Sequence, residues 1–207
     1  MGVFVTFEGG EGSGKSFQSK ALCRKLNELA VPALLTHEPG GTLLGEKLAK
    51  LLKYCRDTDI SPLTELLMFN TSRSQLVNEV LKPELKAGKV VVCDRYTDST
   101  IAYQHFGRGL DLNLVNTVNE AATGGLQPDL TFLLDVPVAV GLARKGNKKP
   151  DRFETEQTVF HQKVRAGYLE LAESEPQRWV VINACQGREK IAGMIWDRVN
   201  KLLSIPG

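Results

Sequence analysis

The sequence is poor in features that would tie it to a membrane or to an oxidising compartment. No hydrophobic run approaches the ~20 residues that a helix needs to cross a bilayer, and the N-terminal residues do not follow the pattern of a secretory signal. The chain has few cysteines: Cys23, Cys55, Cys93 and Cys185. No two of them have the spacing of a disulfide framework, a redox motif or a metal site. We therefore expect a protein of the reducing cytoplasm, without a membrane partner.

An excess of charge of either sign is also missing. Lysine and arginine number 26 against 24 aspartate and glutamate residues, which gives a net charge of +2 over 207 residues. A chain so close to neutrality has no overall attraction to nucleic acid, so no nucleic-acid partner is expected and any basic site must be local. One such site is the segment 144–152. Its cations are Arg144, Lys145, Lys148, Lys149 and Arg152.

Short apolar runs alternate with helical patterns along the chain. The runs predict five strands, at residues 3–7, 32–36, 89–94, 130–135 and 179–183. Apolar residues at helical spacing predict helices at 16–29, 43–54, 62–85 with a bend near Pro83, 97–106, 112–123, 138–144, 151–174 and 188–203. This alternation indicates the α/β class, with a five-stranded parallel sheet flanked by helices on both faces. We expect one domain over residues 1–207.

The segment Gly9–Ser16, "GGEGSGKS", matches the phosphate-binding P-loop in full. It follows a predicted strand and opens a predicted helix, which is the context that the motif requires. Backbone N–H groups of such a loop turn inward around phosphate oxygens, and the helix N-terminus adds partial positive charge. The expected contacts are Lys15 to the β- and γ-phosphates of ATP and Ser16 to Mg²⁺. The other residues of the phosphate cradle are Gly9, Gly10, Glu11, Gly12, Ser13 and Gly14.

A P-loop alone leaves a GTPase switch, an ATP-driven motor and a small-molecule kinase open. The GTPase motif N-K-x-D has only a near match in 147–151, where the aspartate comes one residue late. A motor is expected to end its acidic strand in a pair of carboxylates, whereas the strand 89–94 ends in Asp94 followed at once by Arg95. A carboxylate at the carboxyl end of a buried strand can hold the Mg²⁺ shell opposite Ser16. The fork of Arg95 donors suits a second phosphate. A kinase is therefore favoured.

Four further blocks make the prediction specific. They are "VCDRYTDSTIAYQ" at 92–104, "HEPGGTLLGE" at 37–46, "LLMFNTSRSQL" at 66–76 and "DRFE" at 151–154. Together with the P-loop, and in this order, they resemble the thymidylate kinases, and the resemblance runs from Phe4 to at least Glu154. It implies a P-loop fold, transfer of the γ-phosphoryl of ATP to thymidine monophosphate (dTMP), and a Mg²⁺ cofactor. It also implies a homodimer built from helices.

The resemblance assigns the acceptor base to four residues. Phe69 would stack on thymine, and Arg73, one helical turn further on, would donate to a thymine carbonyl. Gln104 would pair with the N3–H and the neighbouring carbonyl through its amide. Tyr103 would pack under the deoxyribose. A core role for Phe69, and a half-buried helical role for Tyr103, remain the alternatives.

The acceptor phosphate is assigned to the strand ends. Arg95 would hold it, with Ser99 supporting the loop, and Glu38 belongs to a loop that lies against the monophosphate in the family. Family members often carry an arginine before this glutamate, where this chain has His37. This difference puts a phosphate contact at that point in doubt, and a simple loop histidine is the favoured interpretation.

The basic segment resembles the lid of the bacterial enzymes, at about residues 143–154. The P-loop contains no basic residue before Lys15, so the cation for the transition state must come from elsewhere. The prediction is Arg152 for the transferring phosphoryl and Arg144 for the adenine or phosphates, with Lys148 and Lys149 in reserve. Glu11 would orient groups on the acceptor side. A solvated loop is the alternative.

No general base is expected, because the attacking phosphate monoester is already anionic at neutral pH. The predicted catalytic set is Lys15, Arg95, Arg152, Asp94 and Glu11. Two other functions stay open. One is a kinase for another nucleotide or nucleoside, which the Arg73 and Gln104 pair should discriminate. The other is a nucleotide-switched interaction protein, which would hydrolyse ATP in response to a partner protein.

Overall fold

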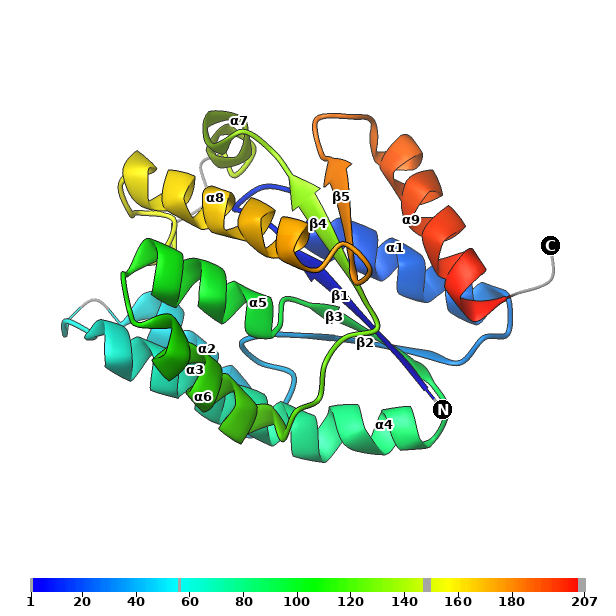
Figure 1. Cartoon of the computed structure of the whole chain (residues 1–207), viewed down its shortest axis with the longest axis horizontal. Coiled ribbons are helices and arrows are strands. Elements are labelled where there is room, and N and C mark those ends of the chain that lie inside the picture. The colour runs from blue at the N-terminus through cyan, green and yellow to red at the C-terminus, as the bar shows by residue number, and fades with distance from the viewer. Residues whose placement is uncertain (1, 56, 147–149, 205–207) are drawn as a thin grey trace.

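The protein is built around one sheet of five parallel strands (Figure 1). The computed structural model describes residues 2–55, 57–146 and 150–204. The strands are β1 (Val3–Glu8), β2 (Ala33–His37), β3 (Val90–Asp94), β4 (Leu130–Asp135) and β5 (Trp179–Asn183). Their order in the sheet is β2-β3-β1-β4-β5, and each neighbouring pair is parallel. All five predicted strands and the α/β class are confirmed.

Helices connect the strands. They are α1 (Lys15–Glu28), α2 (Leu43–Tyr54), α3 (Pro62–Leu76), α4 (Lys82–Lys86), α5 (Thr97–Thr100), α6 (Leu112–Thr123), α7 (Val138–Ala143), α8 (Thr158–Ser174) and α9 (Arg188–Leu203). Two π-helical segments, η1 (Val77–Leu81) and η2 (Ile101–Gly107), continue α3 and α5. No helix in the described ranges has the length and hydropathy to cross a membrane.

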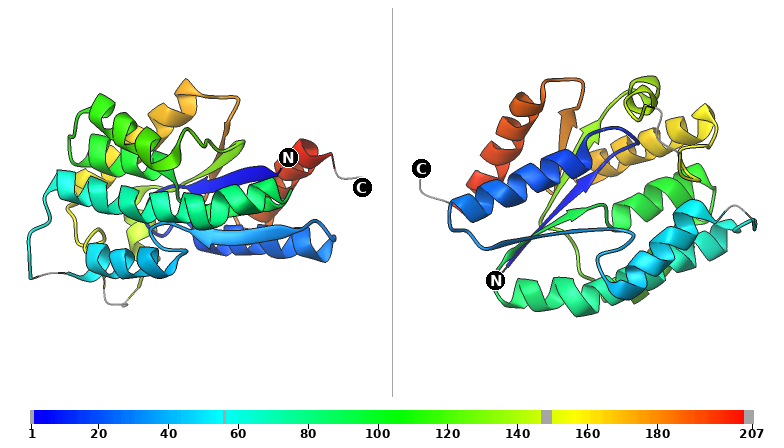
Figure 2. Two further views of the ribbon diagram at one scale, coloured as in Figure 1. Left: turned by 90° about the horizontal axis from the view of Figure 1, so that it is seen from below. Right: turned by 180° about the vertical axis from the view of Figure 1, so that it is seen from behind.

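Alternating strand residues pack against opposite layers. In β1, Val5 and Phe7 join a core with α1 and α9, whereas Phe4 joins a core with η1 on the other face. Successive side chains of a strand point to opposite faces, so a strand covered on both sides must be apolar throughout. Helix α8 and η2 complete the second face with the core that contains Leu133. Figure 2 shows α1 and α9, in blue and red, side by side.

The predicted helix 62–85 is divided into three segments. The N–H of Lys82 donates to the carbonyl of Val77, a spacing of five residues in place of four. Pro83 follows and has no N–H, and its ring would collide with the carbonyl four residues before it in a regular helix. The wider π turn at η1 accommodates both effects, so the expected bend near Pro83 is present as a change of helix type.

The helix predicted over 151–174 is wrong in its first turns, because α8 begins only at Thr158. The residues before it form turns. Asp151 and Glu154 each accept a hydrogen bond from the other's backbone N–H, at 2.9 and 3.2 Å. The N–H of Arg152 donates to the carbonyl of Lys53, at the end of α2. The backbone N–H groups of this segment therefore find hydrogen-bond acceptors without forming a helix. The helical spacing of its apolar residues did not reveal these contacts.

Candidate active site

The P-loop connects β1 to α1, and its shape depends on close approaches that only glycine allows. Gly12 lies so close to α7 that a Cβ there would come within 1.9 Å of the carbonyl oxygen of Gly141. Gly14 has a φ of 95°, in the left-handed region that favours glycine. The ammonium of Lys15 donates to the carbonyls of Gly9 and Gly10, at 2.9 and 2.8 Å. The loop thus holds this cation over its own concave side, where phosphate oxygens bind in the motif.

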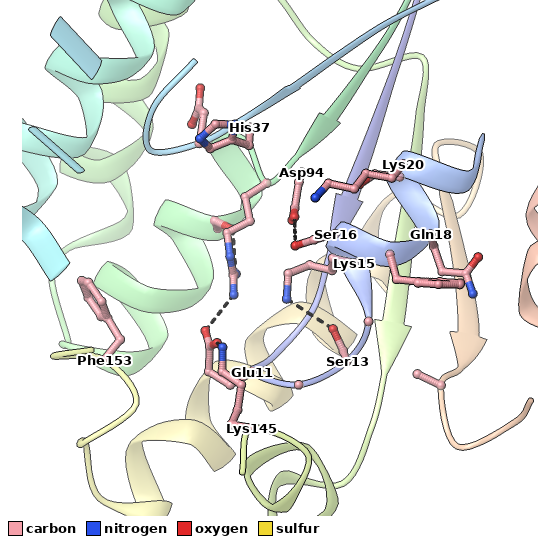
Figure 3. Close-up of a pocket in the computed structure, with 18 of the residues that line it drawn as sticks. Glu11, Ser13, Lys15, Ser16, Gln18, Lys20, His37, Asp94, Lys145 and Phe153 are labelled. Carbon is pink, nitrogen blue, oxygen red and sulfur yellow. Dashed lines mark hydrogen bonds and ion pairs between the residues drawn. The ribbon is translucent and has the colours of Figure 1, made fainter. Parts of the chain in front are cut away.

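Ser16, in the first turn of α1, lies beside Asp94, at the carboxyl end of β3. The Ser16 hydroxyl donates to Oδ2 of Asp94, and Figure 3 shows the two side chains facing each other beside Lys15. Hydroxyl, carboxylate and phosphate oxygens are the ligands that Mg²⁺ prefers. The pair predicted from the sequence is therefore brought together, and its donor set fits a Mg²⁺ ion that also binds the phosphates of ATP.

Arg95 follows β3 with an unusual backbone φ of 74°. Its Nη2 donates to Glu11 Oε1 at 2.8 Å and to the Tyr103 hydroxyl at 3.2 Å. Its Nη1 donates to Ser99 at 3.3 Å and to the Tyr168 hydroxyl at 3.1 Å. These contacts bring the predicted residues Arg95, Ser99, Tyr103 and Glu11 together. Side chains of α5, η2 and α8 hold the guanidinium beside Glu11 of the P-loop, and its contact with an acceptor phosphate stays a prediction.

The residue that the sequence reading missed here is Glu8, at the last position of β1. It is fully buried and accepts hydrogen bonds from the backbone N–H of Tyr96 (2.7 Å), from Ser99 Oγ (2.6 Å) and from the Tyr168 hydroxyl (2.8 Å). Burial raises the pKa of Glu8 from 4.5 to about 7. The signal was present, because a charged residue ended an apolar strand next to the P-loop. Tyr168, on α8, carried no such signal.

Charges around Glu11 shape the electrostatics of the loop. Burial alone would raise the pKa of Glu11, but the cations Arg95, Lys15 and Lys145 together lower it well below its ordinary value. Burial and the nearby charge of Arg95 lower the pKa of Lys15 from 10.5 to about 8. The site therefore combines an ionised carboxylate with three cations, and an anionic ligand would be attracted to these cations.

A cavity of about 940 Å³ opens at this edge of the sheet. Its lining includes the P-loop, the end of β2, Asp94 and Arg95, and on the far side Phe69, Tyr103 and Gln104. Phe153, from the block "DRFE", also lines it, and its ring centroid lies 5.7 Å from that of Phe69. The second aromatic wall was not predicted as a site residue, although the motif containing it was recognised.

Arg73 and Glu38 form a buried ion pair beside the cavity. Arg73 is 1% exposed, and its Nε and Nη2 donate to Oε2 of Glu38 at 2.8 and 2.6 Å. The remaining N–H groups of Arg73 donate to Asn70, Thr100, Asn119 and the carbonyl of Tyr96. The fork of donors is thus engaged within the protein. A direct bond from Arg73 to thymine stays a prediction, and it would require one of these bonds to be exchanged.

Arg152 is held by α2 and α3. Its Nη2 donates to Glu65 of α3 at 2.6 Å, and its Nε donates to the carbonyl of Leu52 at 3.1 Å. The buried carboxylate of Glu65 attracts the cation. Contact of Arg152 with the transferring phosphoryl stays a prediction.

Two other cations of the basic segment face the P-loop. Nζ of Lys145 lies 3.3 Å from Glu11 Oε2, and Arg144 donates to the carbonyl of Ala184, after β5, at 3.0 Å. Arg144 also donates to the carbonyl of Gly12, at 3.5 Å. Arg144 therefore bridges the P-loop and the loop after β5. The reserve residues Lys148 and Lys149 lie outside the described residues.

His37 is the last residue of β2 rather than a loop residue, and it lines the cavity. Its Nε2 lies 3.1 Å from Glu46 Oε1, and both side chains are half exposed. Among the described residues, no cluster of three or more histidine, cysteine, aspartate or glutamate side chains is arranged to hold a metal ion. A metal at this site would therefore depend on phosphate oxygens in addition to Ser16 and Asp94.

Comparison with known proteins identifies the family. Residues 7–195 match the family model described as thymidylate kinase. The chain is 52% identical over 206 residues to a thymidylate kinase of Dehalococcoides mccartyi (strain ATCC BAA-2266 / KCTC 15142 / 195), with 100% of both chains covered. It is 43% identical over 217 residues to one of Roseiflexus sp. (strain RS-1), covering 99% of this chain and 96% of the relative. The crystal structure of thymidylate kinase from Ehrlichia chaffeensis matches with a TM-score of 0.74 and 37% identity, over 87% of this chain and 92% of that one. This chain therefore belongs to the thymidylate kinase family.

Proposed function

We propose that this protein transfers the γ-phosphoryl of ATP to dTMP, giving ADP and thymidine diphosphate. The main support for the proposal is a contact between the P-loop and Arg95, two groups suited to binding anions that line the same cavity. Arg95, at the end of β3, donates to Glu11 of the P-loop at 2.8 Å. A donor triphosphate on the loop and an acceptor phosphate on Arg95 would therefore meet end to end, as phosphoryl transfer between two nucleotides requires.

The donor side binds ATP through the P-loop. Backbone N–H groups and the N-terminus of α1 face the phosphates, with Lys15 between the β- and γ-groups. Ser16 and Asp94 would hold Mg²⁺, and this ion supplies neutralisation of charge on the β- and γ-oxygens when it is bound. Arg144 would contact the adenine or phosphate end, which its bond to Ala184 O at 3.0 Å supports.

The acceptor side would bind dTMP against an aromatic wall. Phe69 would stack on the base, Phe153 packs directly against Phe69 and extends that wall, and Tyr103 would pack under the sugar. Arg95 would take the 5′-phosphate in exchange for part of its bonds to Glu11, Ser99 and the tyrosines. Glu38 would act through Arg73, whose guanidinium it fixes. In this arrangement one oxygen of the acceptor phosphate would face the γ-phosphorus of ATP.

Catalysis follows from positioning and charge. The transition state of phosphoryl transfer is loose, so cations around the transferring group do most of the work. Lys15 lies on one side of that group. We place Lys145 and Arg144 on the other, because both face the P-loop, and we keep Arg152 as the alternative. The acceptor phosphate needs no general base, since it is already anionic at neutral pH.

We further propose that residues 1–207 form one domain with a basic lid at about 143–154, and that the protein works as a homodimer in the cytoplasm. Large apolar side chains are exposed on the neighbouring helices α2, α3 and α6. They are Leu43, Leu44, Leu51, Tyr54, Leu63, Leu67, Leu112 and Leu114. An apolar surface of this kind favours association of two copies. The four cysteines are free, as suits a reducing compartment.

The test is a transfer assay with ATP and Mg²⁺, run in parallel with the deoxy monophosphates of thymine, uracil, cytosine and adenine. We expect strong turnover of dTMP and weaker turnover of dUMP, because one methyl group is worth only about 1–3 kcal/mol. No turnover of the cytosine or adenine nucleotides is expected. Turnover of another acceptor in preference to dTMP would contradict the base pocket. ATP binding without transfer to any of them would support a nucleotide-switched interaction protein.

A further inference from the structure

Glu65 has no direct role in the proposed phosphoryl transfer, but it lies beside the residues expected to bind the base. It lies on α3, one helical turn before Phe69, and its side chain is completely buried. Oε2 accepts from Arg152 at 2.6 Å and from Arg108 at 3.2 Å, and Oε1 accepts from Arg108 at 3.3 Å. Two guanidinium groups therefore meet this carboxylate at the edge of the acceptor pocket, where it acts as an acceptor of hydrogen bonds only.

The fourth hydrogen bond to Glu65 comes from the pocket itself. Gln104 lines the cavity, and its Nε2 donates to Glu65 Oε1 at 2.7 Å. Because a carboxylate cannot donate, the atom of the Gln104 amide that faces it must be the NH₂ group. The amide oxygen of Gln104 is buried and has no hydrogen-bond partner among the described residues. A buried acceptor without a partner costs about 1–3 kcal/mol, which a ligand donor would recover.

We propose that Glu65 is a positioning residue that fixes the polarity of Gln104, so that the pocket accepts only bases with an N–H at position 3. Thymine carries a donor at N3, which would meet the free amide oxygen. Cytosine carries an acceptor there, which would face that oxygen with no proton between them. The inference rests on the proposed function and refines it, because the Gln104 amide oxygen, which has no partner in the described residues, is then the atom that meets N3 of the base.

The proposed role of Glu65 concerns selection of the base, and it is distinct from a contribution to stability. Arg73, the other predicted reader of the base, has its donors engaged with Glu38 and its neighbours. Discrimination between thymine and cytosine therefore depends on the orientation of one amide. A site built around one hydrogen bond rejects a ligand of the wrong polarity far more strongly than a ligand that lacks a methyl group.

The variant Glu65→Gln tests the orientation. Its single amide oxygen would turn to Arg108 and Arg152, which can only donate, and its NH₂ group would then face Gln104. Gln104 would flip and present NH₂ to the base. The matched ligands are dTMP and 5-methyl-dCMP, which differ only in the groups at positions 3 and 4. We measure Kd for both by calorimetry and kcat/KM for dTMP.

The wild type is expected to prefer dTMP by about 100-fold or more, and Glu65→Gln is expected to lower this ratio at least tenfold. The control is Glu156→Gln. Glu156 pairs with Nη1 of the same Arg108 at 2.6 Å but does not contact Gln104, so removing its charge should leave the ratio unchanged. An unchanged ratio in Glu65→Gln, or an equal loss in both variants, would overturn the proposal.

A structural measurement covers the case in which Glu65→Gln does not fold. In a crystal structure of the wild type with dTMP, Gln104 Nε2 should keep its bond to Glu65 while Oε1 lies within hydrogen-bond distance of N3. An amide turned away from Glu65 would overturn the proposal. Failure of the wild type to bind or phosphorylate dTMP would instead refute the proposed function, so the two failures are distinguishable.

Discussion

Lys15 shows how far a single residue can be shifted by its surroundings. It is buried, and this burial together with the charge of Arg95 lowers its pKa to about 8. A lysine with a lowered pKa is partly neutral at mildly alkaline pH, whereas the phosphates of bound ATP favour the charged form. The same residue therefore couples binding of ATP to uptake of a proton.

This coupling gives the first prediction. Binding of ATP at pH 8 should take up about half a proton per site, and uptake should vanish near pH 6.5, where Lys15 is already charged. Calorimetric titrations in buffers with different enthalpies of ionisation measure this number directly. Equal heats in all buffers at pH 8 would contradict the assignment.

Arg95 is a second residue whose side chain cannot be replaced by another of the same charge. Its fork contacts Glu11, Ser99, Tyr103 and Tyr168 at once, which a single ammonium group cannot reproduce. We expect Arg95→Lys to raise KM for dTMP about 10- to 100-fold while KM for ATP changes little. Steady-state kinetics with each substrate varied in turn separate the two. A comparable rise in KM for ATP would place Arg95 on the donor side.

At the scale of elements, the turns at 151–157 are expected to contribute to stability, because they connect to α2 and α3. Arg152 joins them to α2 through Leu52 O and to α3 through Glu65. Arg152→Gln removes the cation from a buried carboxylate, so it should lower the free energy of unfolding by about 1–3 kcal/mol. Denaturant unfolding measures this. The control Arg24→Gln affects an exposed pair on α1 and should change stability by less than about 0.5 kcal/mol.

The same variant separates two roles of Arg152. Since its guanidinium lies on Glu65, kcat at saturating substrates should fall by less than about tenfold. A cation that stabilises the transferring phosphoryl is worth about 10³-fold or more. A loss of that size in Arg152→Gln would support the role at the transferring phosphoryl that the sequence predicts for Arg152.

The two π-helical segments also belong to this scale. The sequence predicted continuous helices at 62–85 and 97–106, and helical periodicity alone cannot show where one extra residue is inserted into a turn. Pro83 marked the first departure because it lacks an N–H. The second, η2, brings Ala102, Tyr103 and Gln104 to buried positions, and no residue in it signals the change.

At the scale of the whole molecule, the exposed leucines of α2 and α3 predict association. Figure 1 shows these helices together on one side, with α9 on another. We expect Leu67→Glu, on α3, to convert the dimer into monomers in sedimentation velocity experiments, because a charge would be buried between the two copies. Leu202→Glu, on α9, replaces a leucine of similar exposure and should leave the dimer intact. A monomeric wild type would refute the dimer.

Stability against pH is also a property of the whole molecule, and Glu8 contributes to it. Its folded pKa of about 7 lies above the ordinary 4.5, so the folded state favours the protonated acid. The contribution of Glu8 to stability is therefore fully present below pH 4.5 and is lost as the pH rises to 7. Relative to the wild type, Glu8→Gln should gain roughly 2–3 kcal/mol between pH 4.5 and 8. A stability difference that is constant over this range would contradict the shift.

The sheet, the P-loop and the Asp94–Arg95 pair could be predicted from the sequence, because each is a local pattern. A strand, a glycine-rich turn and a helix start lie within a few consecutive residues, and strand ends meet at one edge of a parallel sheet. Most of the predicted substrate residues also gather at the cavity.

The burial of Glu8, the contact of Arg152 with Glu65 and the hydrogen bond from Gln104 to Glu65 are visible only in the folded protein. Each depends on contacts between residues far apart in the chain, such as the 160 positions between Glu8 and Tyr168. The hydrogen bonds and charges that surround a side chain set its pKa and orientation, and no local pattern specifies these partners.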